Sequence, residues 1–139
     1  MNVTPFRLVL VPGESIFEQV VFAATRAMLS GALQPGQPFP SVRALAADLK
    51  IHPNTAHKVI QHLVQERWLV VNPGVGTLVA TPPPARAGDR RRLLQEDVEK
   101  LVVEAMRVGV RLEEVQAAVE EHWKSLRNLK VVAGDRRDA

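Results

Sequence analysis

The sequence predicts a mainly helical fold with a small β-hairpin, in the order of a winged helix-turn-helix followed by a C-terminal helical hairpin. Three observations predict it. Apolar residues recur at helical spacing in three segments before residue 66. Two β-rich runs, separated by Pro-Gly-Val, follow these segments. A proline-rich stretch at residues 81–90 then leads into two further amphipathic segments.

The first helix is expected to begin at Ser15 and to end at Gly31. Ser15 and Glu18 have the spacing of a capping box, in which each side chain satisfies a free backbone amide of the other residue. The apolar stripe that follows at helical period consists of Phe17, Val20, Val21, Ala24 and Met28. Ahead of this helix, residues 3–11 (VTPFRLVLV) read as a short β-like run that the next Pro-Gly stops.

Two more helices are expected after a turn-rich connection. The second is short, from Ser41 to about Lys50, with one buried face of Val42, Leu45, Ala46 and Leu49. The third starts at Pro53, because the fixed φ of proline suits the first helical position. Its inward face is expected to hold Ala56, Ile60, Leu63 and Val64, and its outward face Asn54, Lys58, Gln61 and Gln65.

The β-rich runs are residues 69–72 (LVVN) and 76–80 (GTLVA), and the residues between them read as the tip of a hairpin. We therefore expect residues 1–80 to form one winged helix-turn-helix domain. Residues 81–90 (TPPPARAGDR) are expected to be a proline-rich linker.

Residues 91–130 are expected to form a two-helix tail that Gly109 interrupts, and residues 131–139 a frayed end. Apolar residues recur along both helices, in near-heptad spacing along the second: Leu94, Val98, Leu101, Val102, Leu112, Val115, Val119, Trp123 and Leu126. These stripes must be buried against something, and the same hairpin of a second copy meets that need. The sequence therefore predicts a homodimer, with Trp68 and Trp123 as core or interface anchors.

Composition excludes several classes of protein. The 139 residues include no cysteine, which removes disulfides, thiolate zinc sites and thiol nucleophiles and fits a reducing cytoplasm. No segment has the length of a membrane span or the form of a signal peptide. We find no phosphate-binding loop and no nucleophile–base pairing, so we expect no enzyme and no cofactor. His52, His57 and His62 are spaced by five residues, which does not suit paired helical metal ligands.

The helices around residues 41–66 have the form of a helix-turn-helix, whose second helix enters the major groove of DNA. Asn54, Thr55, His57 and Lys58 lie in its first two turns, and each can donate a hydrogen bond to a base or a phosphate. The free amides at the start of this helix are also expected to face phosphate. The net charge of +3 permits such binding without demonstrating it.

Residues 15–80 resemble the DNA-binding domain of the GntR family of bacterial regulators. The segments that carry the resemblance are IFEQV (16–20), LSGALQPGQPFPSVRALAADL (29–49), PNTAHKVIQHL (53–63) and GVGTLVA (74–80). The Pro-Asn-Thr at 53–55, the short tail and the segment VGVRLEEVQAAVEE (108–121) are similar to the YtrA subfamily.

The resemblance implies a homodimer on double-stranded operator DNA, with one recognition helix in each half-site of an inverted repeat. It implies that Arg43 contacts DNA from the start of the second helix. It also implies that Gly74 and Gly76 let the expected hairpin of residues 69–80, called the wing, approach the DNA backbone. The expected DNA-binding set is Ser41, Arg43, Asn54, Thr55, His57, Lys58, Gly74, Gly76 and Thr77. By the same resemblance we expect a repressor, of a transporter operon, and no effector is assigned.

This chain departs from the family pattern at four places. The family commonly has a basic residue where Pro53 stands and arginine where His57 stands. Its wing usually carries arginines, but residues 72–77 carry no charge. Its third helix usually ends in glycine, where this chain has Arg67, and a left-handed arginine costs ~1 kcal/mol or more.

Two alternatives stay open. A winged helix can serve as a protein–protein interaction module without sequence-specific DNA binding, although the carboxylate-poor face of the third helix favours DNA. The run Arg90–Arg92 can contact phosphate or be a solvated part of the linker.

Overall fold

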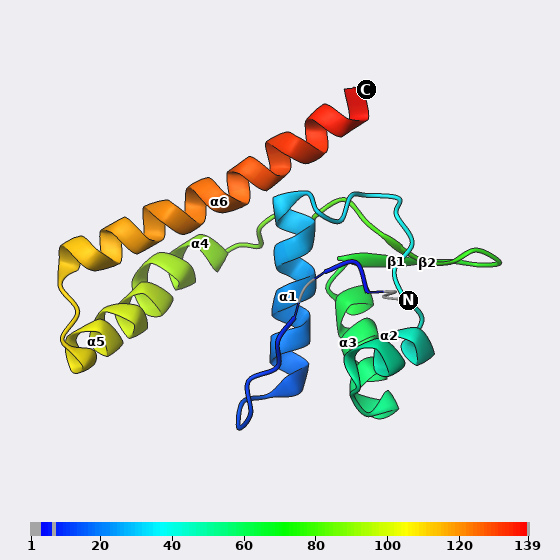
Figure 1. The fold of residues 1–139 in the computed structure, drawn as a ribbon, viewed down its shortest axis with the longest axis horizontal. Coiled ribbons are helices and arrows are strands. Elements are labelled where there is room, and N and C mark those ends of the chain that lie inside the picture. The colour runs from blue at the N-terminus through cyan, green and yellow to red at the C-terminus, as the bar shows by residue number, and fades with distance from the viewer. Residues whose placement is uncertain (1–3, 7, 139) are drawn as a thin grey trace. The chain divides into compact units, whose positions relative to one another are not determined.

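The computed structural model describes residues 4–6 and 8–138, with side-chain exposure described as far as Arg127. The chain divides into two compact units, Met1–Pro83 with Asn128–Ala139, and Pro84–Arg127. The first unit holds α1 (Ile16–Ser30), α2 (Val42–Leu49), α3 (Pro53–Gln65), β1 (Leu69–Asn72) and β2 (Gly76–Val79) (Figure 1). This order confirms the predicted helices and hairpin, with the second strand one residue shorter than expected.

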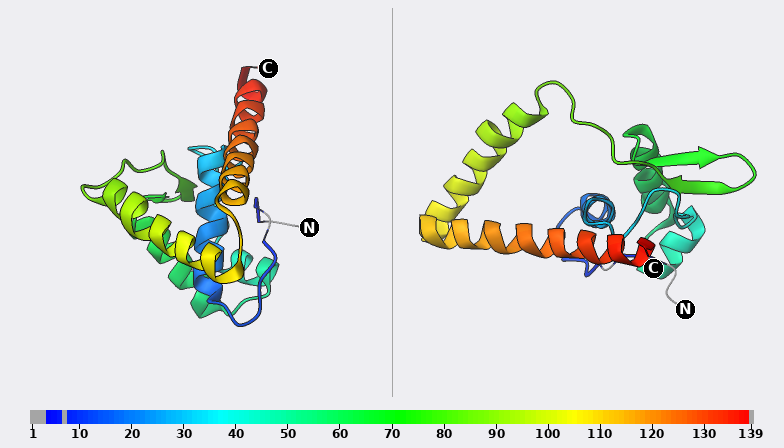
Figure 2. Two further views of the ribbon diagram at one scale, coloured as in Figure 1. Left: turned by 90° about the vertical axis from the view of Figure 1, so that its left-hand side faces the viewer. Right: turned by 90° about the horizontal axis from the view of Figure 1, so that it is seen from above.

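The two strands form an antiparallel hairpin that projects from the helices (Figure 2). Its register pairs Leu69 with Val79 at the base and Asn72 with Gly76 near the tip. The outer edge of β2 is also occupied, since the Phe39 amide donates to the Thr77 carbonyl over 2.8 Å and the Val79 amide to the Gln37 carbonyl over 2.8 Å. The hairpin is thereby fixed to the connection between α1 and α2.

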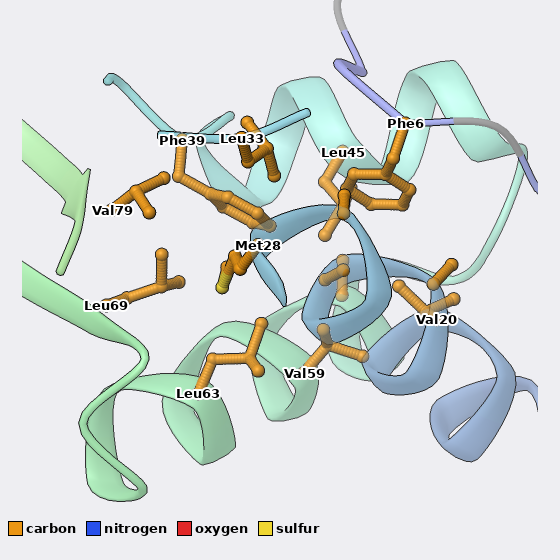
Figure 3. Close-up of a cluster of buried hydrophobic side chains, with 14 of the residues drawn as sticks. Phe6, Val20, Met28, Leu33, Phe39, Leu45, Val59, Leu63, Leu69 and Val79 are labelled. Carbon is orange, nitrogen blue, oxygen red and sulfur yellow. The ribbon is translucent and has the colours of Figure 1, made fainter. Parts of the chain in front are cut away.

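One hydrophobic core joins the three helices to the base of the hairpin (Figure 3). Its largest fully buried side chains are Leu33, Leu45, Leu63, Val20 and Val59. The predicted stripes of α1 and α2 face this core, each partly or fully buried. The sequence interpretation omitted Val59 from the inward face of α3, although Val59 is 0% exposed.

The expectation of a β-like run over residues 3–11 is wrong for the part that the structure describes, in which residues 4–6 and 8–11 form no strand. Side chains satisfy part of this backbone instead: the Thr4 amide donates to Asp48 Oδ2 over 2.9 Å, and the Val11 amide to Gln19 Oε1 over 2.7 Å. Phe6 stacks on Phe39 with 6.1 Å between ring centroids. The segment therefore contributes an aromatic side chain to the core rather than a third strand.

The second unit is helical from Asp89 onward, within the stretch expected to be linker. α4 (Asp89–Arg91), a π-helical segment η1 (Arg92–Asp97) and α5 (Val98–Val108) follow one another without a break. Gly109 ends α5 in the left-handed region with φ 79°, as the sequence predicted. A short turn then leads into α6 (Leu112–Asp138) (Figures 1 and 2). Among the described residues, no helix is both long and apolar enough to cross a membrane.

The tail expected over residues 131–139 is helical as far as Asp138, because α6 continues through Gly134. Glycine inside a helix costs only about 1 kcal/mol relative to alanine, and no proline follows to stop the helix. Residue 139 lies outside the described residues.

Both ends of α3 are closed in an unusual way. His52 is the N-cap, and its Nδ1 accepts from the Asn54 amide over 3.1 Å. At the other end the Arg67 amide donates to the Val64 carbonyl over 3.1 Å and the Trp68 amide to the Leu63 carbonyl over 2.8 Å. These two bonds form a Schellman motif, which places Arg67 in the left-handed region with φ 68°. The predicted strain at Arg67 is thus present.

Replacing Arg67 by glycine should raise the free energy of unfolding by about 0.5–1 kcal/mol, because glycine adopts this φ without the Cβ clash. The check is urea denaturation of the full chain at one fixed protein concentration. The matched control is Gln61→Gly in the middle of α3, which should lower stability by about 1 kcal/mol. A loss of stability in both variants would contradict a left-handed Arg67.

Replacing His52 by alanine should lower the free energy of unfolding by about 1 kcal/mol, since it removes the acceptor of the Asn54 amide. His52→Asn should retain most of the stability, because asparagine is among the best N-caps. His57→Ala, an exposed histidine on the same helix, serves as control and should change stability by less than about 0.5 kcal/mol. Equal losses in the two alanine variants would show that His52 does not act as a cap.

Candidate nucleic-acid interface

The exposed face of α3 is polar and contains no carboxylate. Asn54, His57, Lys58, Gln61 and Gln65 are exposed, and Thr55 is half-buried. Ala56, Val59 and Leu63 lie on the opposite side, in the core. The four residues predicted to face outward are all exposed, so the helix presents the expected side chains to solvent. Such a surface can donate hydrogen bonds to base edges and phosphates without repelling them.

The first-turn amides of α3 are not available to an anion. Pro53 has no N–H, and the Asn54 amide is bonded to the His52 side chain. The amides of Thr55 and Ala56 donate to the His52 carbonyl over 3.0 and 3.1 Å. The expectation of free amides at the start of this helix is therefore wrong, because the cap residue has already engaged them.

The start of α2 is more open. Ser41 is its N-cap, and the Ser41 hydroxyl accepts from the Ala44 amide over 3.1 Å. Within the described residues, no hydrogen bond engages the amides of Val42 and Arg43. The Arg43 side chain is exposed beside them. Two free amides and a guanidinium at a helix N-terminus form a suitable arrangement for a phosphate oxygen.

The starts of α2 and α3 border one surface groove of about 490 Å³. Residues of both helices and of the turn between them line it: Val42, Arg43, Ala46, Ala47, Ile51 and Pro53. Arg43 and Pro53 thus lie at the same groove, and Asn54 and Thr55 directly follow Pro53. The structure therefore places the cation expected from the second helix near the first turn of the third.

The wing presents backbone and apolar side chains. Gly74 and Gly76 have φ of 80° and 120°, so both positions favour glycine, and no atom lies where a Cβ would stand. Val75 between them is 68% exposed. Thr77 is half-buried, and its carbonyl is engaged with Phe39. The wing tip is open enough for close approach to a partner but offers it no charged side chain.

The histidines have separate surroundings. His52 caps α3, and His62 packs edge-on against Phe17 of α1 with 5.3 Å between ring centroids. His57 is exposed on the outer face of α3. No group of three or more metal-ligating side chains occurs among the residues searched, which are the described ones.

The second unit exposes an extended apolar surface. Of the nine residues expected at a dimer interface, Val115 and Leu126 are half-buried and the others are exposed, with Trp123 at 71%. Leu93, Val103 and Met106, which the sequence interpretation did not include in that set, are exposed apolar residues of this unit as well. Its charged residues pair locally: Arg92 lies 3.5 Å from Asp89, and hydrogen bonds from Arg107 lower the pKa of Glu104.

The sequence model of a family described as bacterial regulatory proteins, gntR family, matches residues 17–79. The HTH-type transcriptional repressor YtrA of Bacillus subtilis (strain 168) is 28% identical to this chain over 107 residues. That alignment covers 76% of this chain and 82% of the repressor.

Solved structures share the fold. A transcriptional antiterminator from Listeria monocytogenes EGD-e has a TM-score of 0.73 at 22% identity, covering 91% of this chain and 95% of that chain. A GntR family transcriptional regulator from Listeria monocytogenes has a TM-score of 0.56 at 22% identity, covering 81% and 98%. The family match runs from α1 to β2 and so contains the exposed face of α3. Residues 17–79 thus match the GntR family of DNA-binding transcriptional regulators, which is not a family of enzymes, and the chain as a whole is YtrA-like.

Proposed function

We propose that this protein is a repressor that binds an inverted-repeat operator as a homodimer, with α3 of each copy in the major groove. The observation that carries the proposal is the exposed face of α3, which is polar and free of carboxylates, beside the open N-terminus of α2. The similarity to the repressor YtrA supports repression as its mode of action.

The two helices of the motif have different tasks in this proposal. At the start of α2, the free amides of Val42 and Arg43 and the Arg43 guanidinium hold a backbone phosphate, next to Ser41. Phosphate contacts fix the position of a protein on DNA without reading the sequence. On α3, Asn54, Thr55, His57 and Lys58 extend from the first two turns toward base edges.

The wing has a smaller electrostatic part. Gly74, Gly76 and Thr77 bring backbone close to the DNA, where amides rather than side-chain cations make the contact. Residues 72–77 carry no charge, so the phosphate contacts that release counterions are left to α2 and α3.

Dimerisation is assigned to residues 91–130. The proposed interface consists of Leu94, Val98, Leu101, Val102, Leu112, Val115, Val119, Trp123 and Leu126. Monomeric proteins rarely expose large contiguous apolar patches, and a second copy of the hairpin would cover these side chains. Half-sites of the operator should then lie about one helical turn apart, ~10 bp or a multiple of it.

The regulated genes are proposed to encode a membrane transporter, and the protein to act in the cytoplasm. The alternative, a winged helix that binds another protein, is favoured by the exposed Val70, Val71 and Val75 of the wing. Gel-shift measurements with the protein's own promoter region decide between them: specific retention supports the repressor, and its absence supports the alternative.

Replacing Leu101 by glutamate should convert the dimer into a monomer at tens of micromolar and weaken operator binding by more than tenfold, because a charge would enter the apolar interface. Multi-angle light scattering gives the mass. Lys100→Glu, at the neighbouring exposed position, adds the same acid and is expected to stay dimeric. A monomeric wild-type chain would refute this interface.

Arg43→Ala should weaken binding to all DNA sequences nearly alike and lower the salt slope by about one per copy, as expected for a phosphate contact. Lys58→Ala and His57→Ala should cost roughly 1–3 kcal/mol and relax preference at one operator position. Binding of each variant to a library of operator point mutants at two salt concentrations separates these behaviours. Arg26→Ala, an exposed cation on α1, is the control. If all three variants lose affinity equally for every operator sequence, the sequence preference must come from DNA shape or from the wing.

A further inference from the structure

The groove between the starts of α2 and α3 is apolar although it adjoins the polar face of α3. Five of its six lining residues are apolar, and Arg43 is the exception. Ala46 and Ile51 are buried at its floor, Val42 is half-buried, and Ala47 and Pro53 are exposed. A partner that reaches Asn54 and Thr55 therefore also meets an uncharged patch formed by Ala47 and Pro53.

The backbone of this patch adds no hydrogen-bond donor. Pro53 has no N–H, and the next amide is bonded to His52. A base edge with an exposed donor or acceptor would lose water against the patch and gain no partner, which costs free energy. The major-groove edges of guanine and adenine, and the amino group of cytosine, are polar in this way.

Thymine is the one base whose major-groove edge carries an apolar group, the C5-methyl. Contact with alanine or another apolar side chain is a known means of reading that methyl. A small ligand is a poorer occupant, since specific ligand pockets hold several converging polar groups and Arg43 has the only polar side chain that lines this groove.

We infer that Ala47 and Pro53 form a thymine-methyl contact, which selects T·A at one position of each operator half-site. The inference rests on the proposed function, because it requires α3 to enter the major groove. It assigns sequence preference to two residues without hydrogen-bonding side chains. One of them, Ala47, lies on α2, the helix proposed to hold phosphate.

The test begins with an operator selected from a random duplex library by the full-length protein. Each thymine is then replaced in turn by deoxyuridine, which removes the methyl and keeps base pairing. One thymine in each half-site should show a loss of affinity of roughly three- to tenfold, the effect of exposing one methyl-sized apolar group. The other thymines should show little change.

Pro53→Ser and Ala47→Ser then locate the contact. Each variant should bind the thymine and deoxyuridine operators within about twofold of one another, whereas Ala32→Ser, an exposed alanine outside the groove, should behave as wild type. Circular dichroism checks the fold, and the deoxyuridine scan of the wild-type protein needs no variant.

If the operator is bound specifically but no deoxyuridine substitution lowers the affinity, the inference is wrong and the proposed function stands. A sensitive thymine whose effect persists in both variants overturns the assignment to this groove. Failure to select any operator overturns the proposed function and the inference with it.

Discussion

The burial of Ala56, Val59 and Leu63 is the constraint on which the rest of the first unit depends. These side chains occupy one side of α3 at helical period and pack in the core shared by α1, α2 and the hairpin. Because their burial fixes the rotation of α3 about its axis, Asn54, His57, Lys58, Gln61 and Gln65 must face outward. The surface proposed to meet DNA is thus specified by the same contacts that hold the domain together.

The two ends of α3 set how that surface begins and stops. His52 engages the first-turn amides of α3, whereas two amides at the start of α2 remain free. The Schellman motif at Arg67 turns the chain into β1, whose Leu69 enters the core. The cap and the turn are local, but together they decide which helix start keeps free amides and where the wing begins.

Periodic apolar residues allowed α1, α2, α3 and the hairpin to be predicted from the sequence, because each of these elements buries one face. Properties that depend on distant partners could not be predicted. The segment before α1 resembles a strand, but the Thr4 and Val11 amides bond to the side chains of Asp48 and Gln19 instead of to a sheet edge. A histidine N-cap lies outside the usual set of Ser, Thr, Asp and Asn, so the sequence did not indicate that the first-turn amides of α3 are already bonded. The groove went unseen because the turn between the helices brings Ala47 and Pro53 together.

The uncharged wing has a consequence for how the protein finds its target. Affinity for arbitrary DNA comes almost entirely from phosphate contacts, and each contact fewer shortens the time spent on a wrong site. In the complex proposed here, the uncharged wing tip of Pro73, Gly74 and Val75 adds little to the time that the protein spends on non-specific DNA. The search should proceed by frequent dissociation and hopping more than by long sliding. Occupancy of the operator should also vary less with the ionic strength of the cell than it would with an arginine-bearing wing.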